Sequence, residues 1–288
     1  LVGTMCIQDI KRADVVRFKD ELLKSGQTAA NTKKQLIVVN TLLNYAKANA
    51  LIDTNLASGV SIKVEKKEKP RIAFDAAALN AIFSSPIYQD DDRPDAGAGE
   101  AAYWLPLLAL FTGARLEELG QLHPSDVLEE SYYDAEGSTV SAWVIRIKHS
   151  DEDGQGVKNF GSNRRVPVHS ELVRLGFLAY ALEAKKEGRA RIFYELTVDK
   201  YGTETSQYSK WFNRYMREKC NVTNKRMTFH SFRHTFKDYC RLAGIDVGDK
   251  LTGHVSGSVG DSYGADFYPL HPLVSGIKRY RVLGLDLS

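Results

Sequence analysis

An arginine follows a glycine at the end of an apolar run in the stretch TGARLEEL. Arg115 and Glu118 are three residues apart, so on a helix they share one face. A guanidinium group that leaves water needs a partner, and a purely structural Arg–Glu pair would meet that need. The same pair could instead hold the Arg115 fork toward a phosphate group, which suits a planar bidentate cation. The residues alone leave both interpretations open.

A second stretch, FHSFRHTF, places His230 and Arg233 at i and i+3 on one side of an expected helix. Its three phenylalanines fall at helical spacing and predict a packed core face. His230 and His234 also have the i, i+4 spacing of a zinc-binding helix. The stretch lacks the glutamate of the HExxH motif, and no cysteine or acidic cluster lies nearby, so the support for a metal site is weak.

A third stretch, GVKNFGSNRRVPVH, carries Lys158, Arg164 and Arg165 on or beside an expected hairpin. Positive charge at a hairpin often only protects a solvated sheet edge from aggregation. The functional alternative is a lysine that a movable turn brings into a reactive site.

A fourth stretch, LTGHVSGSVGDSYGADFY, has a histidine at one end and two tyrosines near the other. Taken singly, His254 suggests a structural histidine, and Tyr263 and Tyr268 suggest partly buried anchors. The glycines between them predict a flexible loop.

The segments that must position these residues are mainly helical. Apolar residues recur at helical spacing in 9–24 and 28–52, and Gly26 is typical of a helix end. The charged stretch SIKVEKKEKPRIAF contains Pro70 and is interpreted as an interdomain linker. We therefore expect two domains, a small all-helical one in residues 1–66 and a larger one in 67–288.

The larger domain is expected to begin with a helix capped by Asp75, followed by an apolar helix that ends at TGAR and a further helical run. Residues 138–149 alternate as in a strand, and RRVPVH predicts another. Residues 170–250 are again mostly helical. Helices, a short sheet and then helices favour an α+β fold over alternating βαβ units.

Composition narrows the class of protein. The 288 residues include 39 basic and 36 acidic side chains, a net charge of +3, so a nucleic acid would have to bind to local patches. No apolar run predicts a membrane span, and the first residues lack a signal-peptide pattern. Three cysteines without a CxxC pair are typical of reduced thiols in cytoplasm. The sequence starts without Met, and we expect that an N-terminal segment is missing.

Together, the four stretches resemble the tyrosine recombinase (phage integrase) family, of the prophage or genomic-island type. The resemblance rests on residue order: Arg115 in TGARLEELGQL, Lys158 before RRVP, His230 and Arg233 in HSFRH, His254 in LTGH, and Tyr263 in DSYG. It covers the whole second domain, and the first domain looks like the family's SAM-like, core-binding domain. It implies a mostly helical catalytic domain with a small three-stranded antiparallel sheet.

The resemblance also implies roles. Tyr263 would attack the scissile phosphate and form a covalent 3′-phosphotyrosine, while Arg115 and Arg233 would stabilise the charge on the phosphate oxygens. Lys158 would protonate the leaving 5′-hydroxyl. His230 and His254 would hydrogen-bond the phosphate. Glu118 would support Arg115.

Two assignments stay open within the resemblance. Lys148 remains an alternative for the lysine, and Tyr268 remains one for the nucleophile.

No metal, other cofactor or ATP is expected. The expected partner is double-stranded DNA at attachment sites, bound by a homotetramer that is monomeric without DNA, with accessory DNA-bending or directionality factors and in the nucleoid of the cytoplasm. Local DNA contacts are expected from Lys11, Arg12, Lys33, Lys34, Arg164, Arg165, Lys225 and Arg226, and from the linker that ends at Arg71. Alternatives are relaxation of DNA by a type IB topoisomerase, a non-catalytic DNA-binding descendant, and a metal-dependent nuclease.

Overall fold

The computed structural model describes residues 5–65, 71–150, 154–156, 163–254 and 267–287. The chain divides into two compact units, Leu1–Glu68 and Lys69–Ser288, which are described separately below. Among the described residues, no helix is long and apolar enough to cross a membrane.

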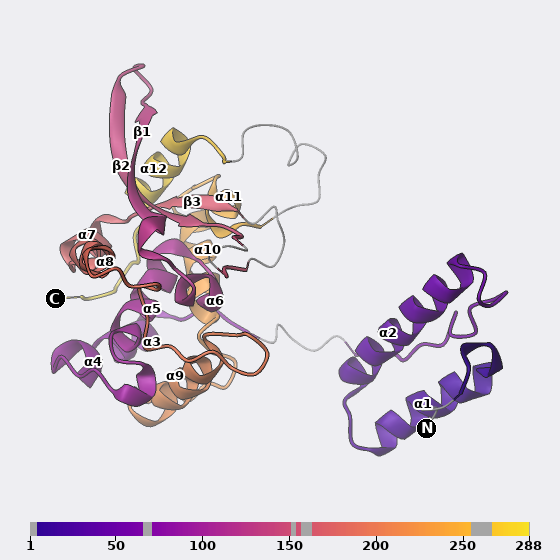
Figure 1. Cartoon of the computed structure of the whole chain (residues 1–288). Helices are drawn as coiled ribbons and strands as arrows, with labels where there is room; N and C mark the ends of the chain where they lie inside the picture. Colours follow the sequence, from indigo (N-terminus) through magenta and orange to yellow (C-terminus); the bar gives the residue numbers. More distant parts are fainter. Residues whose placement is uncertain (1–4, 66–70, 151–153, 157–162, 255–266, 288) are drawn as a thin grey trace. The chain divides into compact units, whose positions relative to one another are not determined.

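Unit 1 is an antiparallel pair of helices, α1 (Arg12–Lys24) and α2 (Ala29–Ala48) (Figure 1). The helix that was predicted for residues 9–24 starts only at Arg12, and a short 3-10 turn at Ile7–Asp9 precedes it. Thr28 caps α2 by accepting a hydrogen bond from the Asn31 amide. The small core contains Val15, Leu36 and Leu43, so the predicted apolar face of the second helix is confirmed.

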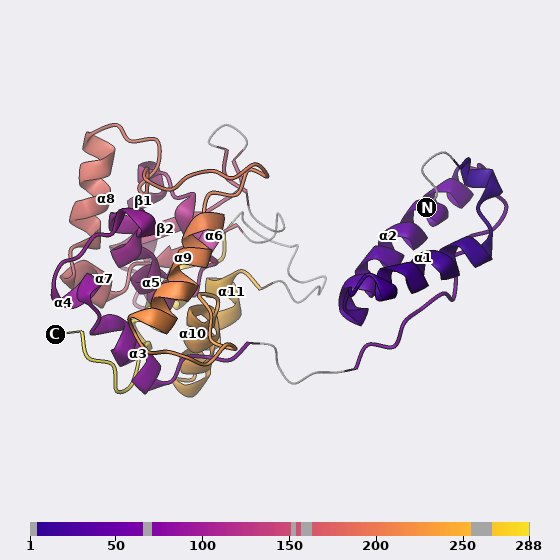
Figure 2. The same cartoon turned by 90° about the horizontal axis from the view of Figure 1, so that it is seen from below.

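Unit 2 is built around α5 (Glu100–Thr112), in which every residue except Glu100 and Tyr103 is buried. A helix this apolar must be covered on all sides. The helix α10 (Ser231–Leu242) packs along it (Figure 2). Phe229, just before α10, and Phe232 and Phe236 within it are buried in the core, as the FHSFRHTF spacing predicts. Asp75 caps α3 (Ala76–Phe83), which confirms that prediction.

The sheet of unit 2 has three antiparallel strands in the order β1 (Val127–Tyr133), β2 (Thr139–Ile147) and β3 (Arg164–Pro167). Val127 pairs with Ile145, and Ile147 pairs with Arg164. The α+β prediction with a small three-stranded antiparallel sheet is therefore confirmed.

The remaining helices enclose this framework. They are α4 (Pro86–Gln89), α6 (Leu116–Gly120), α7 (Ser170–Arg174), α8 (Phe177–Lys186), α9 (Ser206–Glu218), α11 (Gly248–Thr252) and α12 (Leu270–Arg279), with 3-10 turns at Ile7–Asp9, Asp95–Gly97 and Pro124–Asp126. The helix α12 packs on β1 and β3, and α11 also contacts β3 (Figure 1).

Candidate active site

Four elements of unit 2 bring the predicted polar residues together. Arg115 lies at the start of α6, and Arg164 is the first residue of β3. His230 immediately precedes α10, and Arg233 lies in the first turn of that helix. His254 follows α11. These elements are far apart in the sequence, and the packing of α10 on α5 and of α11 on β3 joins them.

A buried carboxylate connects two of the arginines. Glu118 Oε1 accepts a hydrogen bond from Arg115 Nη1 at 2.6 Å, and its Oε2 accepts from Arg164 Nη2 at 2.6 Å and from the Arg115 amide at 2.8 Å. Burial would raise the pKa of Glu118, but Arg164 and Arg115 outweigh it and lower that pKa to about 2. The Arg115 side chain remains 27% exposed, so its guanidinium can also meet a ligand.

Arg233 adds a third guanidinium group beside this pair. It is 6% exposed, and its Nη1 donates to the Gly113 carbonyl at 2.8 Å. Burial, followed by the charges of Arg115 and Arg164, lowers the pKa of Arg233 to about 10. It therefore stays protonated at neutral pH, and the carboxylate of Glu118, which pairs with Arg115 and Arg164, leaves this group of three cations with an excess of positive charge. A bound anion would offset this excess of positive charge.

Two glycines allow the elements to approach this closely. Gly113 has a φ of +64°, and a Cβ at this position would collide with the Phe236 ring. Gly253 has a φ of +63°, and a Cβ there would lie 2.8 Å from Arg164 Nη1. The glycines of TGAR and LTGH are thus required both by their left-handed backbone and by a close neighbour.

His230 immediately precedes α10 and is partly buried. Burial, followed by the nearby His234 and Arg71, lowers the pKa of His230 to about 4. The imidazole is therefore neutral at pH 7 and can accept a hydrogen bond or a proton. Its ring lies 5.1 Å from that of His234, but the described residues contain no group of three or more His, Cys, Asp or Glu side chains that could hold a metal ion.

His254 is exposed, and its amide donates to the Asp249 carbonyl at 2.9 Å at the end of α11. The Asp249 carboxylate in turn pairs with Lys237 of α10 at 2.7 Å. His254 thus follows the end of α11, and the ion pair holds α11 against α10, the helix that begins beside His230 and contains Arg233.

Lys158 and Tyr263 lie outside the described residues, so their roles remain predictions. The chain before Lys158 is held in place: the Gly156 amide donates to Gln121 Oε1 at 2.8 Å, and Gln155 Nε2 donates to Asp126 Oδ2 at 2.6 Å. The alternative lysine, Lys148, has its ammonium 3.6 Å from Asp126 Oδ1.

The alternative tyrosine, Tyr268, is 41% exposed, and its ring lies 5.8 Å from Lys250 Nζ. Its carbonyl accepts a hydrogen bond from Arg165 Nη2 at 2.8 Å. Arg165 also pairs with Glu130 at 2.6 Å and lies over the Phe267 ring. This arginine, predicted to bind DNA, therefore fixes the chain just after the residues around Tyr263.

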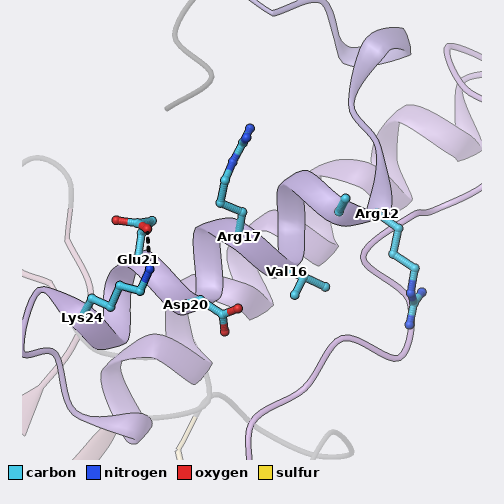
Figure 3. Close-up of a pocket in the computed structure, with 7 residues that line it drawn as sticks. Arg12, Val16, Arg17, Asp20, Glu21 and Lys24 are labelled. Atoms are coloured by element: carbon cyan, nitrogen blue, oxygen red, sulfur yellow. Dashed lines mark hydrogen bonds and ion pairs between the residues drawn. The ribbon is translucent and has the colours of Figure 1, made fainter.

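The other predicted DNA contacts are distributed over both units. Lys11, Lys33, Lys34 and Lys225 are exposed, and Arg226 is partly buried. Arg12 lines a hollow on α1 together with Val16 and Arg17 (Figure 3), and its Nη1 donates to the Ser58 carbonyl at 2.7 Å. The prediction that Arg164 contacts DNA must be corrected. Its side chain is 5% exposed and bonded to Glu118 and the Leu251 carbonyl, so it belongs to the buried cluster and not to the surface.

Glu117 has a role that the sequence analysis did not identify. Its carboxylate accepts hydrogen bonds from the Glu204 and Thr205 amides, at 2.8 and 3.0 Å, and holds the start of α9 against α6. The adjacent acidic residues of RLEEL thus face different partners, Glu118 the arginines and Glu117 the next helix. The i, i+3 spacing pointed to Arg115 as a partner of Glu118, but nothing in the sequence pointed to the partners of Glu117.

Comparison of the sequence with known family models and with the curated proteins finds no match. The fold does match solved structures. The XerH site-specific recombinase bound to difH substrate matches with a TM-score of 0.56 and 16% identity, over 87% of this chain and 66% of that chain. A lambda integrase(75-356) dimer bound to a COC' core site matches with a TM-score of 0.52 and 17% identity, over 91% and 82%.

A lambda integrase tetramer bound to a Holliday junction matches with a TM-score of 0.50 and 19% identity, over 90% of this chain and 67% of that chain. The fold of this chain is therefore that of the tyrosine recombinases, as the sequence resemblance implies.

Proposed function

We propose that the chain is a site-specific tyrosine recombinase that integrates or excises a mobile element. The observation that carries this proposal is the excess of positive charge at Arg115, Arg164 and Arg233: one buried carboxylate pairs with the first two, and the third lies close enough for their charges to lower its pKa. Such a site suits an anion whose charge grows in the transition state, as it does on the non-bridging oxygens of a phosphodiester. The shared fold and the order of the motifs support the same conclusion.

In this mechanism, the Tyr263 hydroxyl oxygen attacks phosphorus and the bond to the 5′ oxygen breaks. The tyrosine proton passes to neutral His230, whose pKa rises when the phosphate brings negative charge beside it. Lys158 gives a proton to the leaving 5′ oxygen. Arg115 and Arg233 bind the phosphate oxygens, and His254 donates a further hydrogen bond.

Rejoining is the reverse of cleavage. A 5′-hydroxyl gives its proton back to Lys158 and attacks the 3′-phosphotyrosine, and Tyr263 leaves with the proton that His230 held. The phosphodiester bond energy is kept in the covalent intermediate, so this scheme needs no nucleotide cofactor.

For unit 1 we propose a core-binding role, in which exposed lysines of α2 contact DNA phosphates. Lys33 and Lys34 lie in the first two turns of α2, and both are exposed. Two of the matching lambda integrase structures are a dimer on a core site and a tetramer on a Holliday junction. For this chain we propose that four copies assemble as a tetramer on two DNA sites.

The test is capture of the covalent intermediate. A pool of random-sequence duplexes, each with a nick a few nucleotides from a possible cleavage site, is incubated with the protein in EDTA and then denatured in SDS. We expect a protein–DNA adduct that Tyr263→Phe abolishes and that the matched variant Tyr268→Phe retains. An adduct lost only in Tyr268→Phe would move the nucleophile to Tyr268.

Other outcomes select the alternative functions. Cleavage that stops in EDTA would indicate a metal-dependent nuclease. Relaxation of a supercoiled plasmid without joined sites would indicate a topoisomerase. Binding without any adduct over the whole pool would overturn the catalytic proposal in favour of a DNA-binding descendant.

A further inference from the structure

A cavity of about 390 Å³ opens directly beside His230, and His230 is the one residue of its lining that the mechanism proposed above uses. Its wall contains Arg71, Glu117, Thr228 and His230, together with hydroxyl and amide side chains of α9 and the turn before that helix. Because His230 belongs both to this cavity and to the arginine cluster, the two sites are contiguous.

Arg71 supplies a cation at this cavity. The residues after it are held on unit 2, since the Ile72 amide donates to the Arg226 carbonyl at 3.3 Å and the Phe74 amide donates to Thr235 Oγ1 at 2.8 Å. Arg71 is exposed and forms no ion pair with a carboxylate in the described part of the chain. Its charge is close enough to lower the pKa of both His230 and His234.

Thr228 supplies a second observation. Its Oγ1 is buried and has no hydrogen-bond partner among the described residues. A buried hydroxyl without a partner is unfavourable, which points to a group that binds there. Glu117 also lines the cavity, but its oxygens are occupied by the Glu204 and Thr205 amides and by Gln121 Nε2.

We propose that this cavity binds a second DNA phosphate, the neighbour of the scissile one, through the Arg71 guanidinium and the Thr228 hydroxyl. Phosphates on one strand recur about every 3.4 Å along the helix axis, so a strand held at the arginine cluster places the next phosphate within reach of a contiguous site. This inference rests on the proposed function, because the scissile position defines which phosphate is the neighbour.

The test combines variants with single neutral phosphates. A duplex is selected from a random pool by binding alone, and methylphosphonate is then placed at one backbone position at a time. Binding is measured with Tyr263→Phe as the background, so that no cleavage interferes. With all other side chains as in the wild type, the protein should bind less tightly when the methylphosphonate replaces the scissile phosphate or its neighbour.

Arg71→Ala is expected to weaken binding about tenfold and to remove the sensitivity at the neighbouring phosphate only. Thr228→Val should weaken binding about threefold, by loss of one hydrogen bond, without lowering the melting temperature, because it deletes an unpartnered hydroxyl. Thr228→Ser keeps the hydroxyl and should bind normally. Arg174→Ala, which removes a surface guanidinium on α7, is the matched control for charge.

Two results with Arg71→Ala would overturn the proposal of a second phosphate site. One is a methylphosphonate profile equal to that of the parent protein, and the other is a loss of sensitivity at the scissile phosphate itself. Failure of the proposed function gives a different result: no covalent adduct forms with active Tyr263, while the binding profile and its dependence on Arg71 persist.

Discussion

Glu118 Oε2 lies 2.6 Å from Arg164 Nη2, and the side chains are 3% and 5% exposed. The same carboxylate binds Arg115, so the start of α6 and the start of β3, which lie far apart in the sequence, depend on one acidic group. Removing one partner of a buried ion pair leaves an unpaired charge in the interior, which costs about 3–5 kcal/mol.

Glu118→Gln is therefore expected to lower the free energy of unfolding of unit 2 by about 3 kcal/mol. All three tryptophans, Trp104, Trp143 and Trp211, lie in unit 2, so their fluorescence during urea unfolding reports on this unit alone. The control is Glu171→Gln, whose partner Arg174 is 52% exposed, and it should cost less than about 1 kcal/mol. Equal losses in the two variants would contradict the buried role of Glu118.

Gly253→Ala tests the close approach of the α11 end to Arg164. Gly244 offers a matched control, because its φ is +62° against +63° for Gly253, but a Cβ there meets nothing within 4 Å. Gly244→Ala should cost only the left-handed strain, about 1 kcal/mol. Gly253→Ala should cost clearly more, because Arg164 must also move, and it should lose covalent adduct formation. Similar unfolding energies for the two variants would show that the neighbour does not matter.

The low pKa of His230 gives the stability of unit 2 a defined pH dependence. With a folded pKa of about 4 and an unfolded value of about 6.5, the unfolded state binds the proton first as the pH falls. The contribution is complete above pH 6.5 and is lost as the pH falls to 4. Because the ring is partly exposed, we expect a change on the order of 1 kcal/mol.

His230→Gln should therefore flatten the plot of unfolding free energy against pH between 6.5 and 4, whatever its effect on absolute stability. Glu118 acts in a lower window, since its pKa is lowered to about 2 and its contribution fades below about pH 4.5. His254→Gln changes an exposed histidine of the same site and serves as the control. If the slope of unfolding free energy against pH were the same in His230→Gln as in the wild type, His230 would not be the source of this pH dependence.

The sequence predicted the elements well where a local rule applies. The apolar run of α5, the aromatic spacing in α10 and the Asp75 cap depend on residues that are neighbours in the chain. The order of the motifs also predicted that Arg115 and Arg233 would meet. What could not be predicted depends on tertiary packing: nothing local distinguishes Arg164, which turns inward to Glu118, from Arg165, which turns outward to Glu130.

Adjacent strand residues point to opposite faces of a sheet, so the RR pair was certain to divide. Which arginine would face the core depends on register with β2, where Ile147 pairs with Arg164. The cavity at Arg71 and Thr228 is equally non-local, because it joins the end of the linker to a turn that precedes α10.

The exposed lysines of unit 1 predict a specific salt dependence of DNA binding. If Lys33 and Lys34 each neutralise a phosphate, replacing both with alanine reduces the slope of log affinity against log salt by about 2. The matched control is Lys185→Ala with Lys186→Ala, an exposed adjacent pair on α8. The comparison needs titrations at several salt concentrations, and an equal slope change in both double variants would argue against a DNA contact by unit 1.

Arg165 allows a test that separates positioning from DNA binding. It contacts Glu130 at 2.6 Å and the Tyr268 carbonyl at 2.8 Å. Arg146 shares the Glu130 carboxylate, at 2.8 Å, and it is the matched control because no contact to Phe267 or Tyr268 is described for it. Both variants, Arg165→Ala and Arg146→Ala, remove the same charge from the same carboxylate.

Because Tyr268 is five residues after Tyr263, releasing its carbonyl should make the attacking position harder to reach. We expect Arg165→Ala to slow covalent adduct formation at least tenfold, by about 1.4 kcal/mol, with DNA affinity nearly unchanged. Arg146→Ala should change neither. If Arg165 instead binds a DNA phosphate, its alanine variant weakens binding and lowers the salt slope by about 1, while the cleavage rate of bound DNA stays constant. Single-turnover cleavage at saturating protein, measured beside equilibrium binding, distinguishes the two roles.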